Sequence, residues 1–333
     1  MTHRSPPEVT RSDLVITPDR TRVLVRPFYP ASHATAQRIV AHLLALSEEE
    51  VTRHYRQVLR DFVHRHDDIE EIMLSRHAQI CESLACGKAL SERRKALIGS
   101  YFLMEYSPES AALFNPSIVP HPDQGRLPKG SLRFILSLRA TGEGHISSIT
   151  FRVGVLDASG SMSLKPTVPF TLQARRIPNE SFFKELFLRK LRETGIHDDF
   201  SLKVMASLPE SFTLDQLKEA LRIERENVSP ADLLADRSCQ TLMLLAESNY
   251  EVHFDPESKL SQRILFPSGP TQINGIEDAR FVRFVDDDGT PTWYATYTAY
   301  DGKVILPQLL ETVDFLHFKF ATLNGPAVRN VKD

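Results

Sequence analysis

The stretch that most constrains the fold of this chain is Asn274–Tyr300, in which two strand-like runs flank an Asp-Asp-Asp-Gly sequence. The runs are Ile276–Val285 and Thr290–Ala299, and both are rich in the β-branched and aromatic residues that strands favour. The sequence between them, Asp286–Gly289, is typical of a turn. The pattern predicts a β-hairpin.

The side chains of this hairpin divide between its two faces. Because strand side chains alternate with a period of two, Asp278 and Arg280 are predicted to share a face, with Glu277 pointing the other way. If Val285 pairs with Thr290, Tyr297 lies opposite Asp278. An acid, a cation and a phenol on one surface favour a site for a polar, hydroxyl-rich ligand.

Two alternatives remain open at this stage. A Glu-Asp-x-Arg sequence after a glycine is also typical of a solvated turn with a surface ion pair, and such a pair contributes about 0–1 kcal/mol. Tyr297 and Tyr300 either stack on a ligand or fill the core of the hairpin.

Helical patterns occur in two blocks. The first spans about 32–107 and contains a capping box at Ser47–Glu50. The second spans about 179–249. Within it, Thr213–Gln216 is a further capping box, and Ser229–Pro230 supplies an N-cap with proline at the next position for the last helix.

Strand periodicity begins at Phe114 and returns after the second helical block. We therefore predict a mainly β fold. An N-terminal, mainly helical extension covers residues 1–110. A β domain covers residues 111–333 and carries a helical insertion at about 179–249.

Composition narrows the class of protein. Hydrophobic residues make up 41% and charged residues 25% of the 333 residues, as in ordinary globular proteins. The net charge of −3 gives no reason to expect nucleic acid or an anionic membrane as a partner. The chain starts without the apolar run of a signal peptide, and no apolar run approaches membrane-spanning length. A cytoplasmic location is the expectation.

The cysteines and clustered histidines give no motif for a metal. Cys81, Cys86 and Cys239 lack the Cys-x-x-Cys spacing of a zinc or redox site, and an odd count in a long chain favours reduced core thiols. His64 and His66 are two positions apart, so on a helix they point in different directions and are predicted to be solvated. We expect no metal and no disulfide.

Four segments together resemble a known enzyme family. The sequence NGIEDARFVRF, followed by WYATYTAYDG, is similar to the signature of glycoside hydrolase family 130, the β-1,4-mannoside phosphorylases and related mannosidases. Matching segments lie, in the same order, at Phe114–Gln124, Leu136–Arg152 and Ile305–Thr312. The resemblance covers most of Phe114–Asn330 and implies a five-bladed β-propeller with its substrate pocket at the central axis.

The resemblance also implies roles for individual residues. Asp278 matches the catalytic acid of the family, while Asn115 and Arg139 match residues that bind the sugar. Arg280 matches the arginine of the motif, which supports the site as an ion-pair partner. Asp255 is the candidate for a further sugar-binding aspartate, and Tyr297 is the candidate for stacking on the sugar.

In such enzymes the acid protonates the leaving oxygen through the sugar's own 3-hydroxyl, and inorganic phosphate replaces the water-activating base. The implied partners are a β-mannoside and phosphate, no cofactor is needed, and an oligomer is possible. Relatives of this form continue past a segment like LNGPAVRN, whereas this sequence ends at Asp333, so we expect an incomplete propeller. Three functions stay open: a mannoside phosphorylase, a hydrolase of the same family, and a non-catalytic carbohydrate-binding protein.

Overall fold

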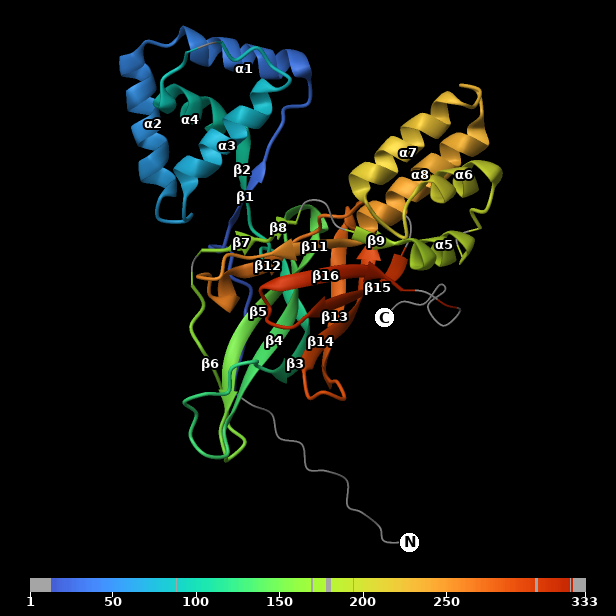
Figure 1. Cartoon of the computed structure of the whole chain (residues 1–333). Coiled ribbons are helices and arrows are strands. Elements are labelled where there is room, and N and C mark those ends of the chain that lie inside the picture. The colour runs from blue at the N-terminus through green and yellow to red at the C-terminus, as the bar shows by residue number, and fades with distance from the viewer. Residues whose placement is uncertain are drawn as a thin grey trace.

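The computed structural model contains both α-helices and β-strands as major elements (Figure 1). A large sheet of 12 strands is present, and α1–α8 lie outside it. The prediction of a mainly β fold is therefore only partly right, since the chain is a mixture of helix and sheet. The structure describes residues 13–87, 89–168, 170–177, 181–193, 195–302, 305–323 and 325.

The first four helices form an N-terminal group with its own apolar core. The predicted capping box opens α2, where the Ser47 hydroxyl accepts from the Glu50 amide and the Glu50 carboxylate accepts from the Ser47 amide. Helices α3 and α4 cross so closely that a Cβ on Gly99 would lie 1.8 Å from the Met73 carbonyl oxygen. The chain enters and leaves this group through a two-stranded sheet, β1 (Leu24–Pro27) paired with β2 (Leu103–Tyr106). The helices are α1 (His33–Ala45), α2 (Glu48–Phe62), α3 (Ile69–Cys81) and α4 (Glu92–Ser100).

The last four helices form a second group with a separate core. The capping box at Thr213 is confirmed at the start of α7. The N-cap predicted at Ser229 is wrong, because the carboxylate of Asp232 caps α8 by accepting from the amides of Leu234 and Ala235. The helices are α5 (Lys184–Glu193), α6 (Asp199–Ser207), α7 (Leu214–Glu226) and α8 (Leu233–Ser248), with the short strands β9 (Ser181–Phe183) and β10 (Ser211–Thr213) paired beside them.

The large sheet contains two antiparallel meanders of four sequential strands each. They join where Gly275 pairs in parallel with Ser147. The first meander is β3 (Ala112–Pro120), β4 (Leu132–Thr141), β5 (Ser147–Leu156) and β6 (Met162–Leu164). The second meander is β13 (Gly275–Val285), β14 (Pro291–Tyr300), β15 (Ile305–Thr312) and β16 (His317–Thr322). Strands β7 (Leu172–Gln173), β8 (Arg175–Arg176), β11 (Tyr250–His253) and β12 (Arg263–Leu265) extend the sheet.

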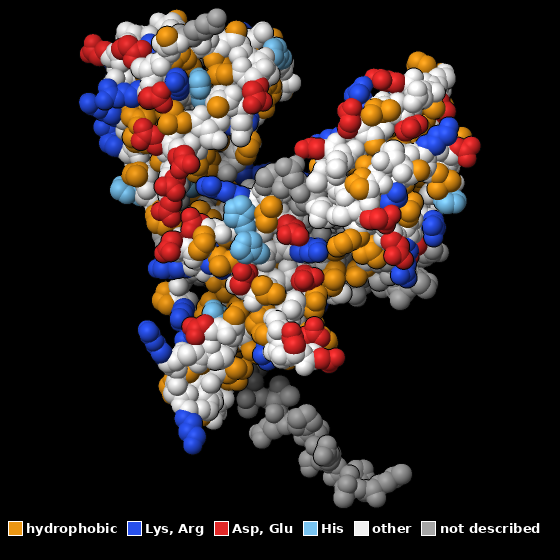
Figure 2. All heavy atoms as spheres, viewed as in Figure 1, with side chains coloured by type: hydrophobic (Ala, Val, Ile, Leu, Met, Phe, Trp, Pro, Cys, Tyr) orange, Lys and Arg blue, Asp and Glu red, His pale blue; other side chains and the backbone are white. Residues whose placement is uncertain are grey.

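The main apolar core lies between the two meanders. Phe151 of β5 packs edge-on against Phe281 of β13 and Phe315, and Trp293 of β14 also contacts Phe315. Strands β3 and β13 also lie against each other, which brings their polar residues together. The two helical groups stand toward the same end of the sheet and form separate lobes with a hollow between them (Figures 1 and 2). None of the described helices is both long and apolar enough to cross a membrane.

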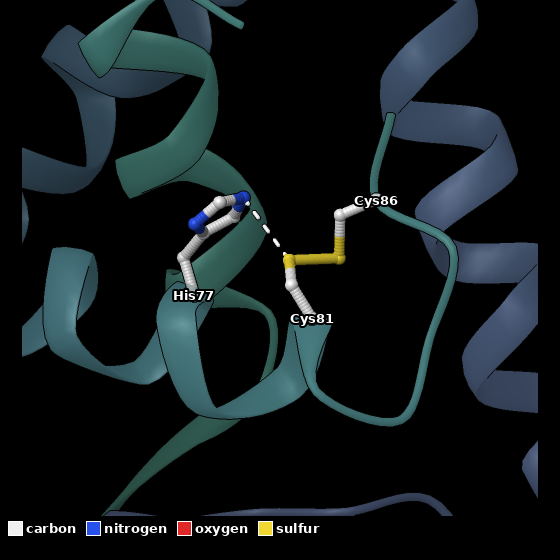
Figure 3. Close-up of side chains that lie close together, drawn as sticks. All are labelled: His77, Cys81 and Cys86. Atoms are coloured by element: carbon white, nitrogen blue, oxygen red, sulfur yellow. Dashed lines mark hydrogen bonds between the residues drawn. A yellow bond between two sulfur atoms is a disulfide. The ribbon is translucent and has the colours of Figure 1, made fainter. Parts of the chain in front are cut away.

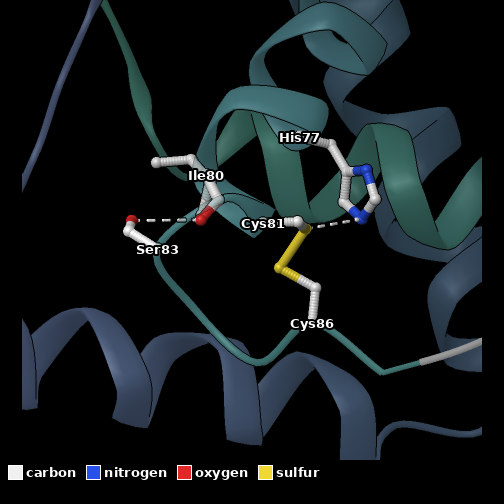
Figure 4. Close-up of a disulfide and its surroundings, with 5 residues drawn as sticks. All are labelled: His77, Ile80, Cys81, Ser83 and Cys86. Atoms are coloured by element: carbon white, nitrogen blue, oxygen red, sulfur yellow. Dashed lines mark hydrogen bonds between the residues drawn. A yellow bond between two sulfur atoms is a disulfide. The ribbon is translucent and has the colours of Figure 1, made fainter.

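The expectation of reduced core thiols is wrong for two of the three cysteines. Cys81 and Cys86 form a disulfide, and Cys239 is a free thiol (Figure 4). Helix α3 ends at Cys81, and a turn in which the Ser83 hydroxyl donates to the Ile80 carbonyl reverses the chain. The Cα atoms of the two cysteines are thereby 5.4 Å apart, which is within the range that a disulfide spans.

The prediction for His66 is also wrong. Helix α2 ends at Phe62, so His66 lies beyond it and turns inward, where its Nε2 lies 2.6 Å from Glu105 Oε1. His66 is buried, whereas His64 is exposed as predicted.

Candidate functional site

A β-bulge shapes the second meander at Asp278. Glu277 pairs with Thr298 and Arg280 pairs with Thr296, so Asp278 and Ala279 together face the single residue between those partners. Asp278 adopts a left-handed backbone conformation with φ 53°. Asp and Asn enter this region more readily than other non-glycine residues.

The first meander carries a matching bulge. Phe114 pairs with Arg139 and Ser117 pairs with Ser137, so Asn115 and Pro116 share one position of the ladder. Asn115 is also left-handed, with φ 50°. Bulges re-aim side chains and are frequent beside functional sites, which makes this pair of bulges a candidate site.

The two bulges contact each other directly. The Asn115 side-chain amide donates to Asp278 Oδ1. Arg280 Nη1 donates to the carbonyl oxygens of Asn115 at 3.0 Å and Pro116 at 3.2 Å. The backbone amide of Phe281 donates to a β3 side chain as well. The bulge conformations are thus tied together across the two strands.

Arg139, near the end of β4, completes the cluster. Its Nη1 lies 3.3 Å from Asp278 Oδ1, its Nη2 lies 2.6 Å from Glu277 Oε1, and its Nε donates to the Ser147 hydroxyl at 2.9 Å. The guanidinium also lies over the Phe114 ring, 4.8 Å from its centroid. Hydrogen bonds and the ring contact together determine its orientation.

The charged side chains of the cluster keep only a small exposed surface. The side chains of Asp278, Glu277 and Arg139 are 7%, 14% and 16% exposed. The guanidinium of Arg139 lies between the carboxylates of Glu277 and Asp278. It therefore occupies the position that a metal cation bound by both carboxylates would need. Among the described residues both contacts of Asp278 fall on Oδ1, which leaves Oδ2 for a ligand.

The bulge overturns the predicted division of faces. Glu277 was expected to point away from Asp278, yet both carboxylates contact Arg139, because the extra residue of the bulge breaks the alternation of β13. Arg280 is exposed and bonds backbone carbonyls, so Arg139 and not Arg280 is the arginine paired with Asp278. Glu277 and Ser147 are the site residues that the sequence pattern missed, since a bulge has no signature in strand periodicity.

Tyr297 lies in the core and not at the site. It has no exposed surface, and its hydroxyl bonds Gln272 at 2.7 Å and Gln308. Burial raises the pKa of Tyr297 well above its usual range. Tyr297 therefore fills the core, which corrects the expectation that it stacks on a ligand.

Asp255 lies in the loop after β11, and its contacts are local. Its carboxylate accepts from the Glu257 amide at 2.8 Å and its carbonyl accepts from Ser258. These bonds describe a capped turn. They do not join Asp255 to the cluster around Asp278.

Comparison with known proteins adds no relative. No protein-family model matches the chain, and no curated protein or solved structure matches it significantly. The chemistry of the site therefore has to be inferred from the arrangement of its own residues.

Proposed function

We propose that the cluster around Asp278 binds the mannose unit of a β-1,4-linked mannoside. The chain would then be a carbohydrate-active enzyme similar to glycoside hydrolase family 130, transferring that mannose to inorganic phosphate. One observation carries the proposal: Asp278 contacts both Asn115 and Arg139, although the three residues come from separate segments of the resemblance and Asn115 and Asp278 are 163 residues apart.

The two meanders support a propeller as the fold behind this site. A propeller blade is a four-stranded antiparallel sheet, and adjacent blades pack face to face around a central axis. Each meander has four sequential strands, and their bulged first strands, β3 and β13, lie side by side. We infer that the meanders are two neighbouring blades, with the candidate site on their axial strands.

Each residue has a distinct task in the proposed reaction. Asn115 and Arg139 orient Asp278 and offer N–H donors toward sugar hydroxyls, which a guanidinium and an amide bind well. Asp278 supplies the proton to the leaving oxygen, relayed by a sugar hydroxyl. Arg280 is a positioning residue, because its bonds to the carbonyls of β3 hold Asn115 against Asp278.

Hydrolysis is the second candidate, and Glu277 is the observation that favours it. An inverting glycosidase needs a second carboxylate to activate water, and Glu277 is a second carboxylate at the same guanidinium. In that reaction water replaces phosphate and the product is free mannose.

The test is turnover of β-1,4-mannobiose by the full chain with and without inorganic phosphate. Phosphorolysis predicts phosphate-dependent release of mannose 1-phosphate, whereas hydrolysis predicts free mannose in either condition. Asp278→Asn should lower the rate about 10²–10⁴-fold, because the amide keeps the shape of the acid but cannot supply a proton. Asp287→Asn, in the exposed turn of the same hairpin, is the matched control and should leave the rate unchanged.

Turnover that is undiminished in Asp278→Asn would contradict the role of Asp278. If the wild-type chain binds mannobiose without turning it over, the chain is a carbohydrate-binding protein and the catalytic part of the proposal fails.

A further inference from the structure

The disulfide in the N-terminal helical group lies beside a histidine (Figure 3). His77 and Cys81 are four residues apart on α3, which places them on the same face of the helix. His77 Nε2 lies 3.2 Å from Cys81 Sγ, and Cys86 closes the disulfide from the following loop. The ring nitrogen and both sulfurs therefore converge on one point.

The spacing of these three atoms fits a metal ion once the disulfide is opened. The ligand atoms all lie within 4.8 Å of one another. Zinc bonds thiolate sulfur at about 2.3 Å and imidazole nitrogen at about 2.0–2.1 Å, so a tetrahedral ion holds such atoms roughly 3.5–3.8 Å apart. A side-chain rotation of either cysteine supplies the separation of the sulfurs.

The surroundings suit a bound ion that keeps contact with solvent. Cys86 is 5% exposed and packs in the apolar core of the N-terminal group, while His77 and Cys81 are half-buried. Two thiolates and one imidazole are a donor set that selects zinc over harder cations.

We propose that His77, Cys81 and Cys86 form a redox-gated zinc site. In the oxidised chain the two sulfurs bond each other, and no site exists. In the reduced chain the two thiolates and His77 Nε2 bind one Zn²⁺, and water takes the fourth tetrahedral position.

A dithiol reductant supplies the electrons that open the disulfide. Exchange with the dithiol breaks the Cys81–Cys86 bond, transfers two electrons and two protons to the cysteines, and leaves the reductant as a disulfide. Binding of Zn²⁺ then releases the two thiol protons. Exchange with a disulfide oxidant, which takes two electrons and two protons and becomes a dithiol, re-forms the Cys81–Cys86 bond and releases the ion.

The test is titration of the full chain with Co²⁺ and Zn²⁺ after reduction by a phosphine. The phosphine and one water convert the disulfide to two thiols and leave the phosphine oxide. Reduced chain should bind one Co²⁺ with a thiolate-to-cobalt charge-transfer band and tetrahedral visible absorption, and Zn²⁺ should displace it. Native mass spectrometry should find one zinc with the loss of two protons, and the oxidised chain should bind neither ion.

Variants identify the ligands. His77→Ala should weaken binding by more than the roughly 10–100-fold that loss of an outer-shell partner costs. Cys239→Ser should leave binding unchanged, because Cys239 lies in the second helical group. Cys81→Ser should abolish binding by removing one thiolate ligand; if it does not fold, His77→Gln with the circular dichroism of the wild type serves instead.

Either of two results would overturn the proposal. The first is a reduced, folded chain without a charge-transfer band at excess Co²⁺. The second is zinc affinity that stays the same in the His77 variants.

Discussion

Two arginine–carboxylate clusters of this protein, one around Glu109 and one around Asp278, differ in how their charges are paired. In one, Glu109 has no exposed surface and accepts from Arg22, from Arg152 at 2.9 Å through both oxygens, and from the Thr150 hydroxyl at 3.1 Å. In the other, Arg139 contacts the largely buried carboxylates of Asp278 and Glu277 at a pair of bulges. Among the ion pairs of the described residues, Glu109 pairs with two arginines, whereas Arg139 pairs with two carboxylates.

We attribute the difference to a structural role of the first cluster and to the proposed ligand-binding role of the second. A buried carboxylate is tolerated when both of its oxygens are paired, as in Glu109. Asp278 instead keeps one oxygen outside the cluster, and two strained backbones hold it there. The left-handed backbones of Asn115 and Asp278 and the incomplete pairing of the Asp278 carboxylate both cost free energy. A purely structural contact does not require either cost.

Of the variants that test this comparison, a substitution of Glu109 should cause the largest loss of unfolding free energy. Glu109→Gln removes the charge that compensates Arg22 and Arg152, and breaking such a buried pair costs about 3–5 kcal/mol. Asp278→Asn should cost less, because its amide oxygen can still accept from Asn115 and Arg139, and Glu277 still pairs with Arg139. Urea unfolding of both variants measures the two free energies, and equal losses would erase the distinction between the clusters.

A smaller effect is expected at the bulge of β3. Asn115→Ala should cost about 1–2 kcal/mol of unfolding free energy, because alanine is strained at φ 50°. Asn115→Gly relieves that strain but also lacks the amide that contacts Asp278. The glycine variant should therefore be the more stable of the two in thermal unfolding, and the reverse order would mean that the bulge does not depend on the left-handed conformation.

Arg280 should have a more modest effect. Arg280→Gln removes the bonds to the Asn115 and Pro116 carbonyls, at about 0.5–1.5 kcal/mol, or roughly 3–10-fold in affinity for β-1,4-mannobiose. Arg283→Gln, on the same strand but stacked on Trp293, is the control and should bind normally. If Arg280→Gln binds β-1,4-mannobiose with unchanged affinity, the positioning role proposed for Arg280 is wrong.

The smallest effect concerns a third acid–base pair, His66 with Glu105. Burial lowers the pKa of His66 below its usual value of 6.5. The unfolded chain therefore binds the proton more readily, and stability should fall as the pH drops below about 6.5, by no more than about 1.4 kcal/mol per pH unit. His66→Gln should flatten the stability profile between about pH 7 and 5, whereas exposed His64→Gln should not. A steeper profile after His66→Gln would reverse the assigned sign.

Local sequence signals predicted local structure well. The capping boxes at Ser47 and Thr213 form as expected, because each depends on residues within one helical turn. The hairpin also forms, but its loop extends one residue further, since Val285 pairs with Pro291. The bulge at Asp278 then compensates, so that Glu277 pairs with Thr298 as the predicted register requires.

Features that depend on contacts between distant segments were not predictable from pattern alone. The inward turn of Glu277 requires Arg139 of another meander, and the burial of Tyr297 requires Gln272 and Gln308. The disulfide forms because α3 ends at Cys81, and the spacing between Cys81 and Cys86 in the sequence does not reveal where that helix ends. His77 at four residues before Cys81 was the available signal for that cluster, and it lies outside the usual cysteine motifs.

The most direct test of the central claim is calorimetric titration of β-1,4-mannobiose into the wild-type chain and into Arg139→Gln. A ligand site that uses the guanidinium predicts measurable binding by the wild type and a loss of about 10–100-fold in the variant, as expected for a hydrogen bond to a charged group. Arg283→Gln should match the wild type. Equal affinity of Arg139→Gln and wild type, or no binding by a folded wild-type chain, would contradict the claim that the cluster around Asp278 is a sugar site.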